Sequence, residues 1–265
     1  MIKILRYLKT SFILELKKTL VYPTSFWIVA LTIPLYSLIQ IVFLESIYSQ
    51  TTNFVGYTKY EAYILFGTYT IVQTLGHLIF YNRLSELKGM INGGSQDSFD
   101  MAQTNPIDTH DIATIGRFNF GNIAPLFVSS IIVLYGLFHE YHLLGIINIA
   151  SYLFSIIMGI TIFYLTFLFI STFLFWSPEL QITEDLWDSV LDFGQYPSAL
   201  YKGTIGILFN LIIPVTLMAS VPVDFLLGKI SYQIFIVYIS ILLLLFILTR
   251  LFWNLSIKKY SSFSS

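Results

Sequence analysis

The sequence contains no cysteine among its 265 residues. This absence excludes disulfide bonds, thiolate metal sites and cysteine nucleophiles together. Charged side chains are also scarce: they make up 11% of the chain, whereas soluble domains carry about 25%. The net charge is −1, so the chain has no overall basic field that would attract nucleic acid.

Sequence motifs for catalysis and nucleotide binding are missing as well. The chain has neither a phosphate-binding G-x-x-x-x-G-K-[ST] loop nor a G-x-S-x-G nucleophile elbow. The two histidines of His139-Glu140-Tyr141-His142 lack the four-residue spacing of the zinc motif H-E-x-x-H. We therefore expect no catalytic site, metal site or cofactor in this chain, and predict that it is not an enzyme.

Long apolar runs dominate what is present. Hydrophobic residues make up 56% of the chain, and several runs reach the roughly 20 residues that a membrane-spanning helix needs. We predict an all-α integral membrane protein with six transmembrane helices. The expected spans are 25–48, 60–81, 119–138, 144–176, 203–222 and 230–256. The fourth is too long for a simple crossing, so it must tilt, kink or project beyond the lipid.

The distribution of basic residues orients these spans. If both termini are cytoplasmic, only Lys59 and Lys229 of the 14 lysines and arginines lie outside. Such a bias towards one side favours cytoplasmic termini. Before the first span, residues 1–22 place apolar side chains at helical intervals with lysines mostly on other faces. This pattern is typical of a helix that lies in the inner headgroup layer.

Two long polar segments follow the second and fourth spans on the same side. In the first, residues 82–118, we expect a helix that ends at Gly93-Gly94, a short helix at 97–104, and a stop at Asn105-Pro106. The second, residues 177–202, predicts an amphipathic helix capped by Thr183 and ended by Gly194. We expect this second element to lie at the inner interface.

Polar residues inside apolar spans are costly in lipid, so they mark candidates for a substrate path. Gln73 and His77 are four residues apart and share a helical face. A substrate path and structural hydrogen bonds between helices both explain such residues. The candidate path residues are Tyr36, Gln40, Gln73, His77 and Asn210. Ser151, Ser155 and Gly159 form a small face that favours close packing within the chain or with a second copy.

The whole chain resembles the membrane subunit of ABC-2-type exporters, in particular the bacterial ABC-2 family transporter proteins. The likeness is carried by "GMINGGSQDSFDMAQTNPID" after the second span and by "LDFGQYPSALYKGTIGILFNLIIPVTLMASVPVDFLLG" further on. The resemblance implies a permease in the inner (cytoplasmic) membrane, with a second copy or a related permease beside it. It also implies a separate cytoplasmic ATPase subunit, which would bind ATP and Mg.

The same resemblance assigns a role to the polar segment 82–118. It implies that residues 97–104 form a coupling helix that docks on the ATPase, and that helix 1–22 is a connecting helix. The docking residues it implies are Asp97, Phe99, Asp100, Met101, Gln103 and Thr104. Two alternatives stay open: a multispan carrier or channel without an ATPase, and a membrane protein that transports nothing.

Overall fold

The protein is built from α-helices joined by short 3-10 and π-helical turns. The computed structural model describes residues 2–21, 23–82, 84, 117–140, 145–176, 184–230 and 232–261. Its α-helices are α1 (Ile2–Val21), α2 (Pro23–Tyr48), α3 (Lys59–Gly76), α7 (Ile123–His139), α8 (Ile146–Thr172), α9 (Glu184–Leu191), α10 (Gly203–Ile207), α11 (Leu217–Leu226) and α12 (Tyr232–Ser261). Its π-helices are η1 (His77–Tyr81) and η7 (Leu208–Ile212), and its 3-10 turns are η2 (Phe120–Asn122), η4 (Phe173–Phe175), η5 (Asp192–Gln195) and η6 (Ser198–Leu200). These ranges hold no β-strand, which confirms the predicted all-α class.

Five helical stretches are long and apolar enough to cross a membrane. They are Phe26–Tyr48, Lys59–Tyr81, Phe120–His139, Ile146–Phe175 and Gln233–Ser256. These match five of the six predicted spans. The stretch that begins at Ile146 is the longest, as the sequence predicts.

The predicted span 203–222 is not one straight helix. Its two halves, Gly203–Ile212 and Leu217–Leu226, meet at a bend of 84°. The break falls at Pro214, which has no backbone N–H to continue a helix, and the first half ends in the π-helix η7. The position of Pro214 in the sequence indicates a kink here, but the size of the bend is a finding of the structure.

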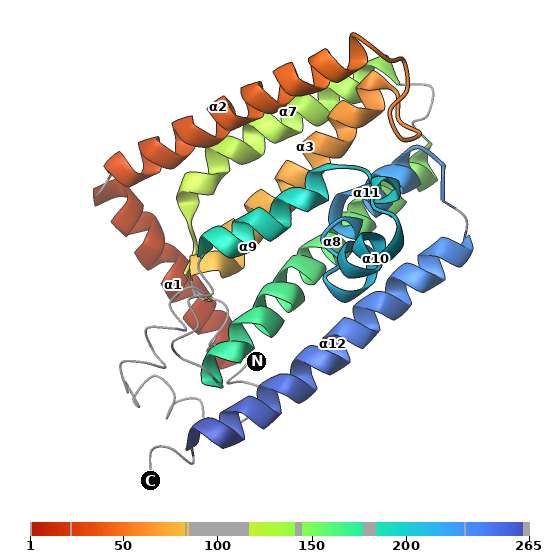
Figure 1. Cartoon of the computed structure of the whole chain (residues 1–265). Coiled ribbons are helices and arrows are strands. Elements are labelled where there is room, and N and C mark those ends of the chain that lie inside the picture. The colour runs from red at the N-terminus through yellow and green to blue at the C-terminus, as the bar shows by residue number, and fades with distance from the viewer. Residues whose placement is uncertain are drawn as a thin grey trace.

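The long helices run between two ends of the bundle (Figure 1). At the end we call the loop end, residues 49–58 connect α2 to α3 and the turn 227–230 follows α11. At the opposite end, the terminal end, lie the start of α1 and the end of α12, so both termini are on the same side. Trp176 ties α8 to α12 there, because its indole Nε1 donates to Ser256 Oγ at 2.7 Å.

Helix α3 occupies the centre of the bundle. It packs against α7, α8 and α11, and every residue from 61 to 70 is buried. Among the five long stretches it is the least apolar and the most buried. Polar side chains such as Thr68 are therefore satisfied inside the protein: its hydroxyl bonds to the Tyr152 hydroxyl on α8 at 2.9 Å.

Helices α2 and α12 form opposite edges of the bundle (Figure 1). Both expose long apolar faces that a lipid bilayer would cover. On α2 the exposed residues are Trp27, Ile28, Leu31, Leu35, Leu38, Ile39, Val42 and Phe43. On α12 they are Ile234, Ile236, Val237, Leu243, Leu244, Phe246, Ile247, Leu248, Leu251 and Leu255.

The N-terminal segment forms a helix of its own, as predicted, and joins α2 at Pro23. Proline is favoured at the first position of a helix, where its missing N–H has no partner to lose. Helix α1 packs on α2 and on η2. Its expected place in the headgroup layer remains a prediction.

The two polar segments are only partly described. The expected docking residues Asp97–Thr104 lie outside the described residues, as do residues 177–183. The described part of the second segment differs from the interfacial placement we expected. Gly194 contacts Tyr69, near the midpoint of α3: a Cβ at Gly194 would lie 3.2 Å from the Tyr69 ring. The run α9–η5 therefore rises inside the bundle rather than lying flat at one end.

Candidate functional site

One face of α3 carries polar and aromatic residues at four-residue intervals. Tyr69, Gln73, His77 and Tyr81 follow this spacing, which places them along one side of the helix. From His77 onward the α-helix gives way to the π-helix η1. Gly76, just before this change, sits directly on the Phe163 ring of α8, so the two helices are in close contact here.

The run α9–η5 lies along this face and supplies two carboxylates. The Tyr69 hydroxyl donates to Asp192 Oδ1 at 3.1 Å. Further towards the terminal end, Asp188 Oδ1 lies 3.4 Å from His77 Nε2. The Tyr81 hydroxyl donates to Asp188 Oδ2 over 3.5 Å, a long bond.

Helix α2 closes the arrangement from the other side. The Tyr36 hydroxyl donates to Gln195 Oε1 at 3.3 Å, and Gln40 Nε2 donates to the same hydroxyl at 3.0 Å. Polar side chains from three elements that are far apart in the sequence thus lie in one row. We call it the polar seam; its members are Tyr36, Gln40, Tyr69, Gln73, His77, Tyr81, Asp188, Asp192 and Gln195.

Aromatic packing fixes α9 beside the seam. Trp187 is buried and stacks on Phe167 with ring centroids 5.0 Å apart. It also meets Phe163 edge-on, and His77 stacks on Tyr81 at 4.3 Å. Such packing holds the acidic residues of α9 in register with α3.

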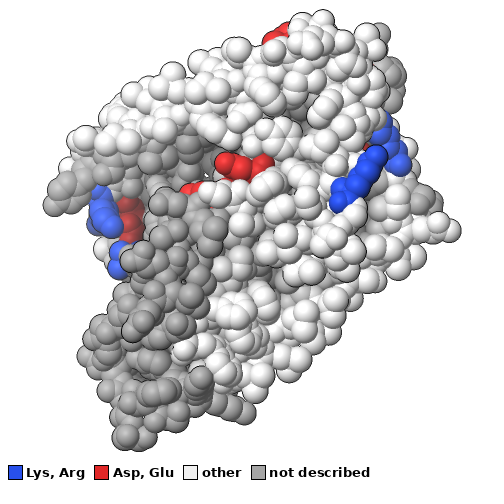
Figure 2. Space-filling model, viewed as in Figure 1, with Lys and Arg blue, Asp and Glu red and all other residues white. Residues whose placement is uncertain are grey.

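The seam is exposed on one face of the single chain. Helix α9 lies at the front of Figure 1, and Figure 2, from the same side, shows acidic side chains in a hollow at this place. The Asp188 side chain is 44% exposed. A solute in the hollow could therefore reach a carboxylate, phenol hydroxyls and side-chain amides.

Four of the five predicted path residues belong to the seam. Tyr36, Gln40 and His77 make the contacts given above, and Gln73 lies on the same face of α3. Asn210 does not belong to it. Its amide is held by the Thr216 hydroxyl and by Ser198 O, so it fixes the turn between α10 and α11.

Sequence reasoning missed the α9 side of the seam. The sequence pattern predicts that the amphipathic helix in residues 177–202 lies at the inner interface, and it gives Asp188, Asp192 and Gln195 no place in the substrate path. Their spacing of four and three residues was a usable signal, because it places them on one helical face. The partner of that face could not be read from the sequence.

Tyr69→Phe tests how firmly the seam is held. The change removes the hydroxyl that donates to the Asp192 carboxylate from α3, and we expect a loss of about 2 kcal/mol in unfolding free energy. Thermal unfolding in mild detergent measures this. Tyr152→Phe is the control, because it removes a bond between two neutral hydroxyls and should cost about half as much. Equal losses would show that the bond to Asp192 contributes no more stability than a bond between two neutral hydroxyls.

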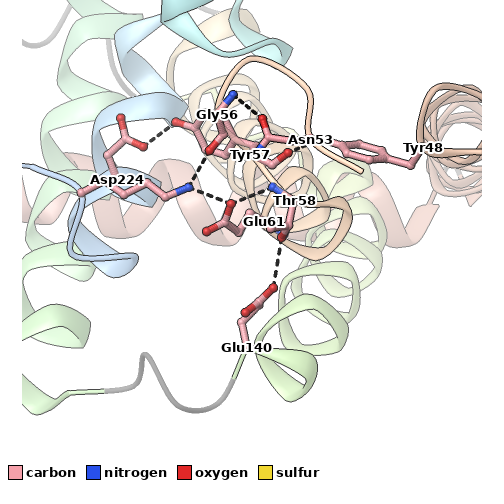
Figure 3. Close-up of polar contacts among 9 residues, drawn as sticks. Tyr48, Asn53, Gly56, Tyr57, Thr58, Glu61, Glu140 and Asp224 are labelled. Atoms are coloured by element: carbon pink, nitrogen blue, oxygen red, sulfur yellow. Dashed lines mark hydrogen bonds and ion pairs between the residues drawn. The ribbon is translucent and has the colours of Figure 1, made fainter. Parts of the chain in front are cut away.

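A second polar cluster lies at the loop end (Figure 3). The Tyr57 hydroxyl donates to Asp224 Oδ1 at 2.5 Å. Lys229 Nζ lies 2.7 Å from Glu61 Oε2 and 2.9 Å from Gly56 O. Burial, and then the Asp224 carboxylate, raise the pKa of the Tyr57 hydroxyl above its usual range, so it stays a donor. We call these residues, Gly56, Tyr57, Glu61, Asp224 and Lys229, the loop-end clasp.

The loop-end clasp has a structural role, because it links several elements of the bundle. Thr58 extends it to α7, because its hydroxyl donates to Glu140 Oε1 at 3.0 Å. Thr58 N also donates to Glu61 Oε2 at 2.7 Å, which caps α3. These polar groups satisfy one another. Within the described ranges, no group of three or more His, Cys, Asp or Glu residues could hold a metal ion.

Comparison with known proteins gives one match. A family model described as ABC-2 family transporter protein matches residues 34–264. No curated protein matches the chain, and neither does any solved structure. The matched range includes α3, α9 and most of α2, and therefore the whole polar seam.

Proposed function

Because the chain belongs to the ABC-2 family of transporter proteins, we propose that it is the permease subunit of an ATP-driven exporter. The family match over most of the chain is the observation that carries this proposal. A bundle with five long apolar helices and one bent pair suits a membrane domain of ABC transport. The sequence has no phosphate-binding loop, so ATP and Mg would bind to a partner ATPase subunit.

We propose that the terminal end faces the cytoplasm. All lysines and arginines except Lys59 and Lys229 fall outside the expected external segments, and positive charge favours the cytoplasmic side. The segment 82–118 leaves α3 and returns to α7 at this end. We propose that this segment meets a cytoplasmic ATPase through the docking residues Asp97, Phe99, Asp100, Met101, Gln103 and Thr104.

The polar seam would then form part of the substrate path. Its residues lie between helices that must separate for a solute to pass, and several of its contacts are long. A second copy or a related permease would complete the path on the exposed side. ATP binding in the partner would shift the balance between two arrangements of the helices.

The docking proposal is tested by purifying the chain from its native cell in mild detergent. ATP hydrolysis is measured on the subunits that co-purify. We expect an ATPase to accompany the wild type, and the double variant Phe99→Asp, Met101→Asp to lose it, because charges would replace apolar anchors. Phe99→Leu, Met101→Leu is the matched control and should retain the ATPase.

Two results would count against this proposal. In one, the wild type purifies without an ATPase. In the other, the aspartate variant keeps its ATPase unchanged while remaining in the membrane fraction. A gradient-driven carrier would then be the favoured alternative, and its transport would stop when the ion gradient across the membrane is collapsed.

A further inference from the structure

The stretch that follows the proposed docking segment is anchored on two elements. Phe118 and Phe120 meet the Phe12 ring of α1 edge-on, at centroid distances of 5.4 and 5.0 Å. Arg117 Nε lies 3.8 Å from Glu15 Oε1, also on α1. Residues 117–120 therefore form a firm link between the returning chain and α1.

The same stretch is bonded to the π-helix at the end of α3. The Asn119 backbone N–H donates to Leu78 O at 3.0 Å, and Leu78 lies within η1. A displacement of residues 117–120 would thus pull directly on η1. This bond is a backbone contact, so it does not depend on a flexible side chain.

A π-helical turn is a suitable place to absorb such a displacement. Its hydrogen bonds span five residues instead of four, and such turns are often found at functional sites. Shifts of helix register occur on the microsecond to millisecond scale. The side chains of η1 would change direction when the turn changes register.

The side chains at the two ends of η1 are those that contact Asp188. His77 and Tyr81 both approach this carboxylate, at 3.4 and 3.5 Å. His77 Nε2 and Asp188 Oδ1 are buried, and neither has a hydrogen-bond partner among the described residues. Buried polar atoms without a hydrogen bond are uncommon and costly. A small movement of η1 would bring this pair into hydrogen-bond geometry.

We propose that η1 transmits movement from residues 117–120 to the polar seam, with Asp188 as the positioning residue that receives it. Asp188 lies on the same helical run as Asp192 and Gln195, which contact α3 and α2. Movement at Asp188 is therefore passed to the middle of the bundle. The inference rests on the proposed function, because it needs a partner that moves the docking segment.

The absence of cysteine makes a direct test practical. Spin labels are placed on Ile39→Cys of α2 and Ala199→Cys of η6, two exposed positions that flank the seam. The distance between the labels is measured in the purified complex with its ATPase, before and after trapping with ATP and orthovanadate. In the otherwise wild-type background we expect the distance distribution to shift on trapping.

Asp188→Asn should abolish this shift while the ATPase stays bound and the melting temperature stays within a few degrees. Asp188→Glu should restore it, because the carboxylate is kept. Glu45→Gln is the control: it removes a carboxylate that lies outside the polar seam, where it pairs with Lys59, and it should keep the shift.

The outcomes separate the two proposals. If no ATPase co-purifies, the proposed function and the transmission role both fail. If the ATPase is present but the labels do not respond to trapping, or if Asp188→Asn responds like the wild type, only the transmission role is overturned.

Discussion

Replacing Gly159 by leucine is expected to leave little folded protein in the membrane. A Cβ at this position would lie 2.6 Å from the backbone carbonyl oxygen of Met218 and 3.4 Å from Val72 Cγ2. Helix α8 crosses α11 at this point, and α11 also packs on α3. A backbone oxygen cannot turn away as a side chain could, so the helices must separate.

The size of the effect follows from overpacking in a tight core. Added methylene groups typically cost about 1–3 kcal/mol, and more where the backbone must move. We expect Gly159→Ala to lower the melting temperature measurably and Gly159→Leu to reduce the yield of monodisperse protein several-fold. Size-exclusion chromatography and thermal unfolding in detergent measure the two effects.

Gly145→Ala provides the control for this prediction. The Cβ it adds would meet only Asn148, at the ordinary contact distance of 3.7 Å. Its stability should match that of the wild type. If Gly159→Ala behaves in the same way, α8 and α11 are not in close contact in the membrane.

Lys229→Met is expected to loosen the loop end of the bundle. Lys229 Nζ is bonded to Glu61 and to Gly56 O, and it lies 4.6 Å from the centre of the Tyr57 ring. Glu61 itself is only 6% exposed. Removal of the cation leaves a buried carboxylate without its counter-charge, a change that costs about 3–5 kcal/mol.

The chain offers a matched control for this ion pair. Lys59 Nζ lies 2.7 Å from Glu45 Oε2, the same distance, but the Glu45 side chain is 47% exposed, far more than that of Glu61. Exposed pairs contribute about 0–1 kcal/mol, so Lys59→Met should change the melting temperature little. Combining Lys229→Met with Glu61→Gln should recover part of the loss, because the buried charge is gone. Equal effects of the two lysine changes would contradict a buried clasp.

Much of the fold could be predicted, because the length of an apolar run indicates directly whether the run can span a membrane. The five long stretches match the prediction because a helix in lipid must be both long and apolar. The face of small residues that ends in Gly159 also predicts close packing. In the structure, α8 packs closely against α11 at Gly159.

The remainder depends on contacts that local patterns do not encode. Pro214 signals a break, yet the 84° bend is set by how α11 packs on α8 and α3. Asp188 and Asp192 have the composition of a solvated surface. Only the position of α9 against α3 makes them part of the seam. That Gln73 and His77 share one face could be predicted, because both residues lie on one helix and their spacing alone defines that face.

The central place of α3 has a consequence for how the protein is made. Each span must first enter the bilayer as a single segment, where its own apolar surface sets its affinity for lipid. Helix α3 is the least apolar of the five long stretches and later the most enclosed. Its stable insertion therefore depends on α7, α8 and α11, which are synthesised after it. During synthesis, α3 must therefore be kept in the membrane until α7, α8 and α11 have been made, whereas α12 can enter the bilayer on its own.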